Sequence, residues 1–134
     1  MLQDFGSEIK YNEGKALNIL LAEDDKNFGI VLKNELEEEG YTVNLVNDGV
    51  EAIQHFIEEP YDLLLIDIKM PKLDGINTLK IIKKLKPAIP VIIFSGNTGF
   101  SYIEEMLKMG VIRYFLKPFE MEELKECIKR NLVQ

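Results

Sequence analysis

The sequence predicts an α/β fold in which a parallel sheet of five strands carries helices on both faces. Short runs rich in Leu, Ile and Val alternate along the chain with amphipathic stretches, which is the pattern of β-α-β crossovers. The run 63–66 (Leu-Leu-Leu-Ile) is apolar throughout, as expected of a strand buried on both faces. The 134 residues suffice for one domain with a substantial core.

The expected strands are the short apolar runs. Each is bounded by polar or turn-forming residues and is rich in residues that favour strands. In chain order they are 17–22, 42–46, 63–66, 91–94 and 114–116.

The expected helices have apolar residues at the three- to four-residue spacing of a helix buried on one face. The first is the clearest, because Phe28, Val31, Leu32 and Leu36 share one face and Gly40 follows as a stop signal. The others are expected at 49–58, 76–85, 102–109 and 121–132.

The chain is expected to hold a single domain at 16–134, preceded by an extension or linker. Residues 1–15 mix charges and glycines without a clear period, and they lack the layout of a signal peptide. No apolar run approaches the roughly 20 residues of a membrane span.

The overall charge restricts the class of partner. The chain carries 16 basic and 23 acidic residues, a net charge of -7. A nucleic-acid groove needs a basic stripe and an anionic membrane attracts basic clusters, so neither partner is expected. A single cysteine, Cys127, excludes an intrachain disulfide and fits a reducing compartment, which predicts a cytoplasmic protein.

Polar residues gather at the carboxyl ends of four predicted strands, which meet at one edge of a parallel sheet. Acids at one edge repel each other unless a cation lies among them, and hard oxygen ligands select Mg²⁺ or Mn²⁺. With a hydroxyl and a lysine, such a site can transfer phosphoryl groups to a carboxylate nucleophile. The residues are Glu23-Asp24-Asp25, Asp67, Ser95-Gly96 and Lys117-Pro118.

Each of these signals, taken alone, also has an ordinary structural explanation. The three adjacent acids could cap the first helix, and Asp67 could be a solvated residue at a strand end. Ser95-Gly96 could form a turn, and a lone lysine is usually exposed. A shared site is favoured because all four signals fall at strand ends in one topology.

The motifs together resemble the receiver domain of two-component response regulators, over roughly 16–132. The resemblance implies a flavodoxin-like sheet with strand order 2-1-3-4-5, as in single-domain receivers of the chemotaxis type. The matching stretches are 20–25 (Leu-Leu-Ala-Glu-Asp-Asp), 67–75 (Asp-Ile-Lys-Met-Pro-Lys-Leu-Asp-Gly), Ser95-Gly96 and 114–119 (Tyr-Phe-Leu-Lys-Pro-Phe).

By position, the resemblance implies that Asp67 is the phosphoryl acceptor and a metal ligand, beside a catalytic Lys117. Asp24 would bind Mg²⁺ directly, Glu23 mainly through water, and Lys69 through its backbone carbonyl. Which two of the three adjacent acids form the functional pair is open. Counting from the strand favours Glu23 and Asp24, with Asp25 turned towards the first helix.

The resemblance also implies a switch. After phosphorylation Ser95 would move to bond a phosphoryl oxygen, and the ring of Tyr114 would occupy the vacated space. The surface at roughly 98–132 would then rearrange. The Lys117–Pro118 peptide is expected to be cis.

The implied partners are proteins. A sensor histidine kinase or a histidine phosphotransfer protein would supply the phosphoryl group. A downstream protein or a fused output domain would receive the signal, and phosphorylation could drive homodimerisation. The domain would promote only its own phosphorylation and dephosphorylation, and so would not be an enzyme.

Three other functions compete with the switch. A phosphatase of the haloacid-dehalogenase type uses an aspartate nucleophile but wants a second acid two residues later, where this chain has Lys69. A flavodoxin-like FMN carrier needs a phosphate-binding loop after the first strand, where three acids would repel phosphate. A receiver that has lost phosphorylation conflicts with the complete set of acid, hydroxyl and lysine.

Overall fold

The chain is described by a computed structural model that covers residues 16–96 and 100–132, without the side chains of residues 100–102. The predicted extension at 1–15 and the first two residues of the predicted switch surface, 98 and 99, lie outside the described residues. In the described ranges no helix has both the length and the apolar character needed to cross a membrane.

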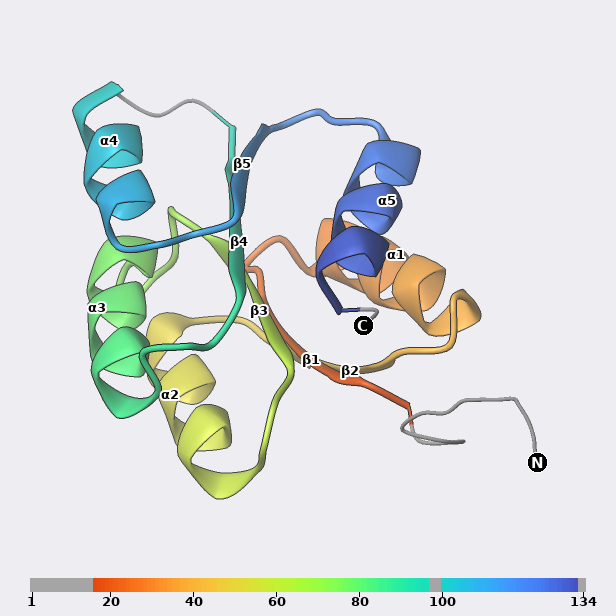
Figure 1. The fold of residues 1–134 in the computed structure, drawn as a ribbon, viewed down its shortest axis with the longest axis horizontal. Helices are drawn as coiled ribbons and strands as arrows, with labels where there is room; N and C mark the ends of the chain where they lie inside the picture. The colour runs from red at the N-terminus through yellow and green to blue at the C-terminus, as the bar shows by residue number, and fades with distance from the viewer. Residues whose placement is uncertain (1–15, 97–99, 133–134) are drawn as a thin grey trace.

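A single five-stranded sheet forms the centre of the molecule, in the order β2-β1-β3-β4-β5 that the resemblance implied (Figure 1). All four neighbouring pairs are parallel, which requires a crossover between each strand and the next. The central strand β3 is buried at every residue, as its apolar sequence predicts. The strands are β1 (Asn18–Ala22), β2 (Thr42–Val46), β3 (Leu63–Asp67), β4 (Val91–Ser95) and β5 (Arg113–Leu116).

Five helices cover the sheet in two layers. Helices α1 and α5 lie on one face, and α2, α3 and α4 lie on the other (Figure 1). Each layer encloses its own apolar cluster, one built around Leu20, Ile66 and Leu79 and the other around Leu21, Leu65 and Ile128. The helices are α1 (Lys26–Glu38), α2 (Gly49–Glu58), α3 (Gly75–Leu85), α4 (Phe100–Lys108) and α5 (Met121–Leu132).

The predicted and observed elements agree closely. The second strand, the second helix and the last helix have the predicted bounds, and the other elements with predicted bounds differ by one or two residues at one or both ends. Cys127 is buried on the inner face of α5, as its place on the apolar stripe predicts. The Lys117–Pro118 peptide is cis, as the resemblance implied.

Aspartates start three of the helices at the carboxyl edge of the sheet. Asp25, Asp48 and Asp74 each precede a helix and accept a hydrogen bond from the backbone N–H three residues further on. These caps fix where α1, α2 and α3 begin, and therefore the path of the loops that leave the strand ends.

The loop from β3 to α3 closes tightly on the strand that carries Asp67. The Gly75 backbone N–H donates to the Ile68 carbonyl at 2.8 Å, and the Ile68 N–H donates to the Phe94 carbonyl of β4 at 3.1 Å. A Cβ on Gly75 would lie 2.4 Å from the Asp67 carbonyl oxygen and 2.7 Å from the Ile68 Cα. Because both atoms belong to the backbone, this close approach requires glycine.

Gly75→Ala is therefore expected to lower the free energy of unfolding by about 2 kcal/mol or more, since the backbone must move to admit the methyl group. Gly96→Ala is the control, because a Cβ at Gly96 would have no atom within 4 Å. Its effect should stay within about 0.5 kcal/mol. Urea denaturation followed by circular dichroism measures both, and equal losses in the two variants would contradict this account.

Candidate functional site

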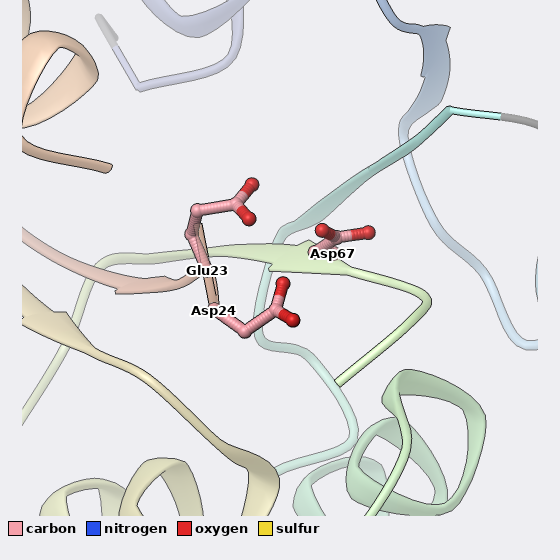
Figure 2. A group of neighbouring side chains, drawn as sticks. All are labelled: Glu23, Asp24 and Asp67. Carbon is pink, nitrogen blue, oxygen red and sulfur yellow. The ribbon is translucent and has the colours of Figure 1, made fainter. Parts of the chain in front are cut away.

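Three carboxylates meet where β1 and β3 end. Glu23 and Asp24 follow β1, Asp67 is the last residue of β3, and one oxygen from each lies within 4.8 Å of the others. Figure 2 shows the three side chains converging from neighbouring strands. Glu23 and Asp67 are buried, whereas Asp24 is exposed, so the cluster opens to solvent on the Asp24 side.

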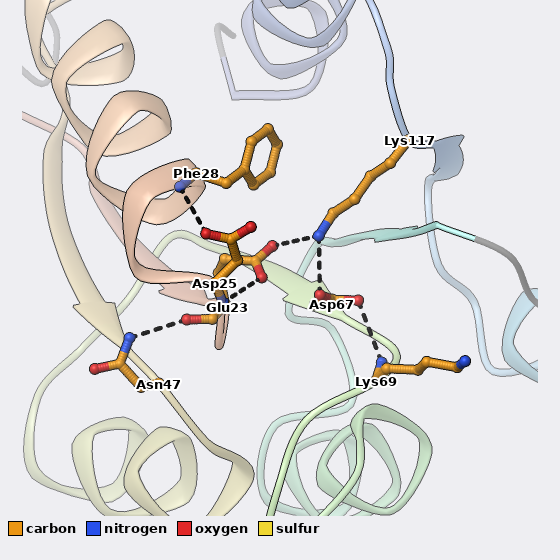
Figure 3. A network of polar contacts seen from close by, with 7 residues as sticks. All are labelled: Glu23, Asp25, Phe28, Asn47, Asp67, Lys69 and Lys117. Carbon is orange, nitrogen blue, oxygen red and sulfur yellow. Dashed lines mark hydrogen bonds and ion pairs between the residues drawn. The ribbon is translucent and has the colours of Figure 1, made fainter.

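Lys117 reaches two of these acids from the end of the edge strand β5. It follows β5, and its Nζ donates to Glu23 Oε1 at 2.8 Å and to Asp67 Oδ2 at 3.0 Å (Figure 3). The Nζ also lies 4.7 Å from the ring centroid of Phe28 and 5.4 Å from that of Phe94. The ammonium group is therefore held by two carboxylates and two aromatic faces.

The pKa values of Glu23 and Lys117 both depart from their ordinary values, because the two groups are buried next to each other. Burial raises the pKa of Glu23 to about 7, although hydrogen bonds from Lys117 and from the Asp25 N–H act in the opposite direction. Burial alone would lower the pKa of Lys117, but its bonds to Glu23 and Asp67 outweigh burial and the pKa lies above its ordinary value. The lysine is thus held in its charged form.

Asp25 is turned away from the cluster, as the count from the strand favoured. Its Oδ1 accepts a hydrogen bond from the Phe28 N–H at 3.1 Å, so it caps α1 (Figure 3). Its own N–H donates to Glu23 Oε2 at 2.9 Å. The capping explanation therefore applies to Asp25, while Glu23 and Asp24 face Asp67.

The other predicted residues surround the same point. Ser95 ends β4 as a buried residue, and its carbonyl accepts the Lys117 backbone N–H at 2.7 Å. The Lys69 N–H donates to Asp67 Oδ1 at 3.2 Å, while its side chain belongs to an exposed residue. Tyr114 lies in β5, half-buried against the cluster on the α2–α4 face.

Sequence reasoning missed two contributors to this edge. Phe28 was expected only as a core residue, yet its ring lies against the Lys117 ammonium group. The end of β2 was not considered, yet the Asn47 side-chain amide donates to the Glu23 carbonyl at 3.0 Å. A signal for Asn47 was available, because β2 delivers its last residues to the same edge as the other parallel strands.

The residues present fit a divalent cation. Three carboxylates supply hard oxygen atoms, and among the described residues this is the one group of acids, histidines and cysteines close enough to share an ion. Mg²⁺ commonly takes one or two carboxylates and keeps several waters, which suits a cluster that opens to solvent. A buried carboxylate beside a cation site and a lysine can also accept an electrophile such as a phosphoryl group.

Comparisons with known proteins give a consistent result. The family model of the response regulator receiver domain matches residues 19–129. Transcriptional regulatory protein ZraR of Escherichia coli K12 is 37% identical over 116 residues, which are 87% of this chain and 26% of the regulator. The chain thus spans about a quarter of the length of that relative.

Two further relatives are matched over nearly their whole length. Sporulation initiation phosphotransferase F of Bacillus subtilis is 32% identical over 114 residues, 85% of this chain and 92% of that protein. A solved structure of the receiver domain of sensor histidine kinase PA1611 from Pseudomonas aeruginosa, with a magnesium ion coordinated in its active site cleft, has a TM-score of 0.80. It is 30% identical, and the match covers 90% of this chain and all of that one.

The raised pKa of Glu23 predicts a pH dependence of stability in metal-free protein. The folded state holds the proton more tightly than the unfolded state does, because the pKa rises from 4.5 to about 7. This contribution to the free energy of unfolding is present below pH 4.5 and is lost as the pH rises through 7, by at most about 1.4 kcal/mol per pH unit.

Urea unfolding between pH 4 and 8 in the presence of a chelator measures this effect against Glu23→Gln, which stays neutral throughout. The difference in unfolding free energy between the two proteins should change between pH 4.5 and 7. Parallel curves across this window would contradict the assignment.

Proposed function

The chain belongs to the response regulator receiver domain family, the phosphoacceptor domains of two-component signalling, and on that premise we propose that Asp67 is the residue that accepts the phosphoryl group. One observation carries the proposal. Asp67 is a buried carboxylate that lies between a charged lysine and two further acids at the carboxyl edge of the sheet. An acid with a purely structural role at a strand end would not require a lysine and two further carboxylates around it.

The transfer forms one bond and breaks another. An Asp67 carboxylate oxygen attacks the phosphorus atom of a phosphohistidine on the partner, a P–O bond forms, and the P–N bond breaks with its electron pair returning to the imidazole. The product is an acyl phosphate on Asp67. The attack comes from the carboxylate form of Asp67, whose Oδ2 lies 3.0 Å from the Lys117 ammonium group.

Asp24, Asp67, Glu23 and the Lys69 backbone carbonyl would hold Mg²⁺, or Mn²⁺ in its place. Asp24 and Asp67 would be the direct carboxylate ligands, and Glu23 would act mainly through water, as the resemblance implies. When bound, the ion supplies positive charge to the phosphoryl oxygens. The relative with magnesium in its cleft supports the choice of ion.

Lys117 carries the second positive charge. In this structure its Nζ donates to Asp67 Oδ2. A phosphoryl group attached to the Asp67 carboxylate would bring its own oxygen atoms close to the same ammonium group, which could then donate to one of them. The Phe28 and Phe94 rings restrict where the ammonium group can go.

Ser95 and Tyr114 would pass the change of charge to the surface. Ser95 ends the strand beside Asp67, and Tyr114 lies one strand further out, paired with Ile93 in the sheet register. Ser95 moves towards the phosphoryl group, Tyr114 turns inward, and the surface of α4, β5 and α5 rearranges. Homodimerisation through this surface is one form of output.

The partners follow from the family. A sensor histidine kinase or a histidine phosphotransfer protein donates the phosphoryl group, and a downstream protein or a fused output domain reads the switch. The domain turns over no external substrate beyond its own phosphorylation and dephosphorylation. The buried free thiol of Cys127 is compatible with a cytoplasmic location.

The haloacid-dehalogenase alternative lacks support. The residue two positions after the nucleophile is Lys69, whose side chain is exposed and supplies no second acid. The relatives named above are a transcriptional regulatory protein, a phosphotransferase and a receiver domain of a histidine kinase, not phosphatases of that type.

Incubation with Mg²⁺ and acetyl phosphate should add one phosphoryl group to the chain, measured as intact mass. Asp67→Ala should gain none, because it lacks the acceptor oxygen. The matched control is Asp25→Asn, which can still cap α1 and lies outside the carboxylate cluster. An undiminished adduct in Asp67→Ala, or none in the unchanged protein, would refute the assignment.

Lys117→Met should slow phosphorylation by about 100-fold, because it removes a charged donor from the transferring group. Lys125→Met is the control, since Lys125 also bonds a glutamate, Glu35, at 2.7 Å, but from α5 and away from the cluster. The rates come from quenched reactions with acetyl phosphate. Equal rates in the two variants would exclude Lys117 from the transfer.

A further inference from the structure

The end of β2 contributes no acid to the carboxylate cluster, yet it contacts the segment that carries Glu23. The Glu23 N–H donates to the Val46 carbonyl at 2.9 Å, and the Asn47 side-chain amide donates to the Glu23 carbonyl at 3.0 Å (Figure 3). Both backbone polar groups of Glu23 are thus held by two adjacent residues, Val46 at the end of β2 and Asn47 directly after it. This anchors the turn from which the Glu23 and Asp24 side chains project.

Asp48, which follows Asn47, contacts the loop between β3 and α3 that carries Lys69. Asp48 is buried, and its Oδ2 lies 3.4 Å from the Nζ of Lys72 in the loop between β3 and α3. Lys72 is the one residue other than glycine with positive φ in the described part of the chain, at 67°. The ion pair therefore holds the loop at Lys72, the residue with the positive φ, three residues after Lys69.

The same loop rests directly on the first residue of α2. A Cβ on Gly49 would lie 2.2 Å from the Leu73 carbonyl oxygen and 2.2 Å from Thr78 Oγ1. The absence of a side chain at Gly49 lets the loop backbone approach the start of the helix closely. The loop therefore packs against the start of α2 at Gly49 and is also joined to it by the Asp48–Lys72 ion pair.

The turn that makes these contacts is itself rigid. The Asp48 side chain accepts from the Glu51 N–H at 2.8 Å, and Glu51 Oε1 accepts from the Asn47 N–H at 2.9 Å. This reciprocal arrangement resembles a capping box and fixes both residues at the start of α2. The bond from the Glu51 N–H, and after it Lys72, hold the pKa of Asp48 below its ordinary value against the effect of burial.

We propose that Asn47 and Asp48 are positioning residues for the cation site, tying the Glu23–Asp24 segment to the β3–α3 loop so that their ligand oxygens keep a fixed separation. The inference rests on the proposed function, because it concerns the same Mg²⁺ site. Partners that orient metal ligands without touching the ion set affinity by limiting how far the ligands can drift. Here one rigid turn restrains two ligand segments that are far apart in sequence.

The first test compares two asparagines of the same region. Asn47→Ala should weaken Mg²⁺ binding about 10-fold, measured by isothermal titration calorimetry, because the Glu23 carbonyl loses its partner. Asn44→Ala is the control, since the Asn44 amide makes similar bonds to Glu59 and Tyr61 but away from the cluster. It should leave the dissociation constant unchanged even where it lowers the melting temperature.

The second test concerns the ion pair. Asp48→Asn can still cap α2, and Lys72→Asn suits a positive φ, so each removes a charge while preserving the backbone. Each should raise the Mg²⁺ dissociation constant about 3-fold, as expected of a partly exposed pair. The double variant should be no weaker than either single one, and Lys72→Arg should restore binding.

The outcomes separate this inference from the proposed function. Normal Mg²⁺ binding in Asn47→Ala, Asp48→Asn and Lys72→Asn would overturn the positioning role while leaving the phosphoacceptor site intact. Weakened binding matched by an equal effect in Asn44→Ala would reduce the role to general stability and also overturn it. An unchanged protein that binds no Mg²⁺ would overturn both proposals.

Discussion

The site depends on one lysine that is shared by two buried carboxylates. Glu23 and Asp67 come from different strands, and Lys117 comes from a third segment, 50 residues or more away along the chain. Removing two carboxylates from water is costly, and the ammonium group that both carboxylates share offsets part of that cost. Burial raises the pKa of Glu23 to about 7 although Lys117 acts in the opposite direction, and a bound cation would add positive charge at the same place.

Lys117 is also linked through its backbone to Ser95, one of the two proposed switch residues. Its N–H bonds the Ser95 carbonyl, so the acceptor, the hydroxyl and the lysine are connected through β3, β4 and the segment after β5. Tyr114 lies in β5, the strand that leads into this segment. On the proposed assignment, a change in charge at Asp67 would act on residues that share strand pairings with the α4–β5–α5 surface, and no separate transmitting element would be required.

Much of this was predictable because a parallel sheet turns sequence order into spatial proximity. Asp67, Ser95 and Lys117 could be placed at one edge from strand ends alone, and the bounds of β2, α2 and α5 were obtained directly from periodicity. The contacts that could not be predicted share a physical reason. Which oxygen Lys117 bonds, the contact of its ammonium group with Phe28, and the reach of Asn47 to Glu23 depend on side-chain directions and loop paths. These have no period in the sequence.

The closed loop between β3 and α3 has a consequence for how the domain can vary. The loop is fastened at both ends, by Gly75 to Ile68 and by Ile68 to Phe94, and its middle is seated on Gly49. An inserted or deleted residue would break this closure and shift the backbone at Asp67, which constrains the spacing between Asp67 and α3. Variation in this loop is then left to exchanges of exposed side chains such as that of Lys69, while the length of the loop stays constant.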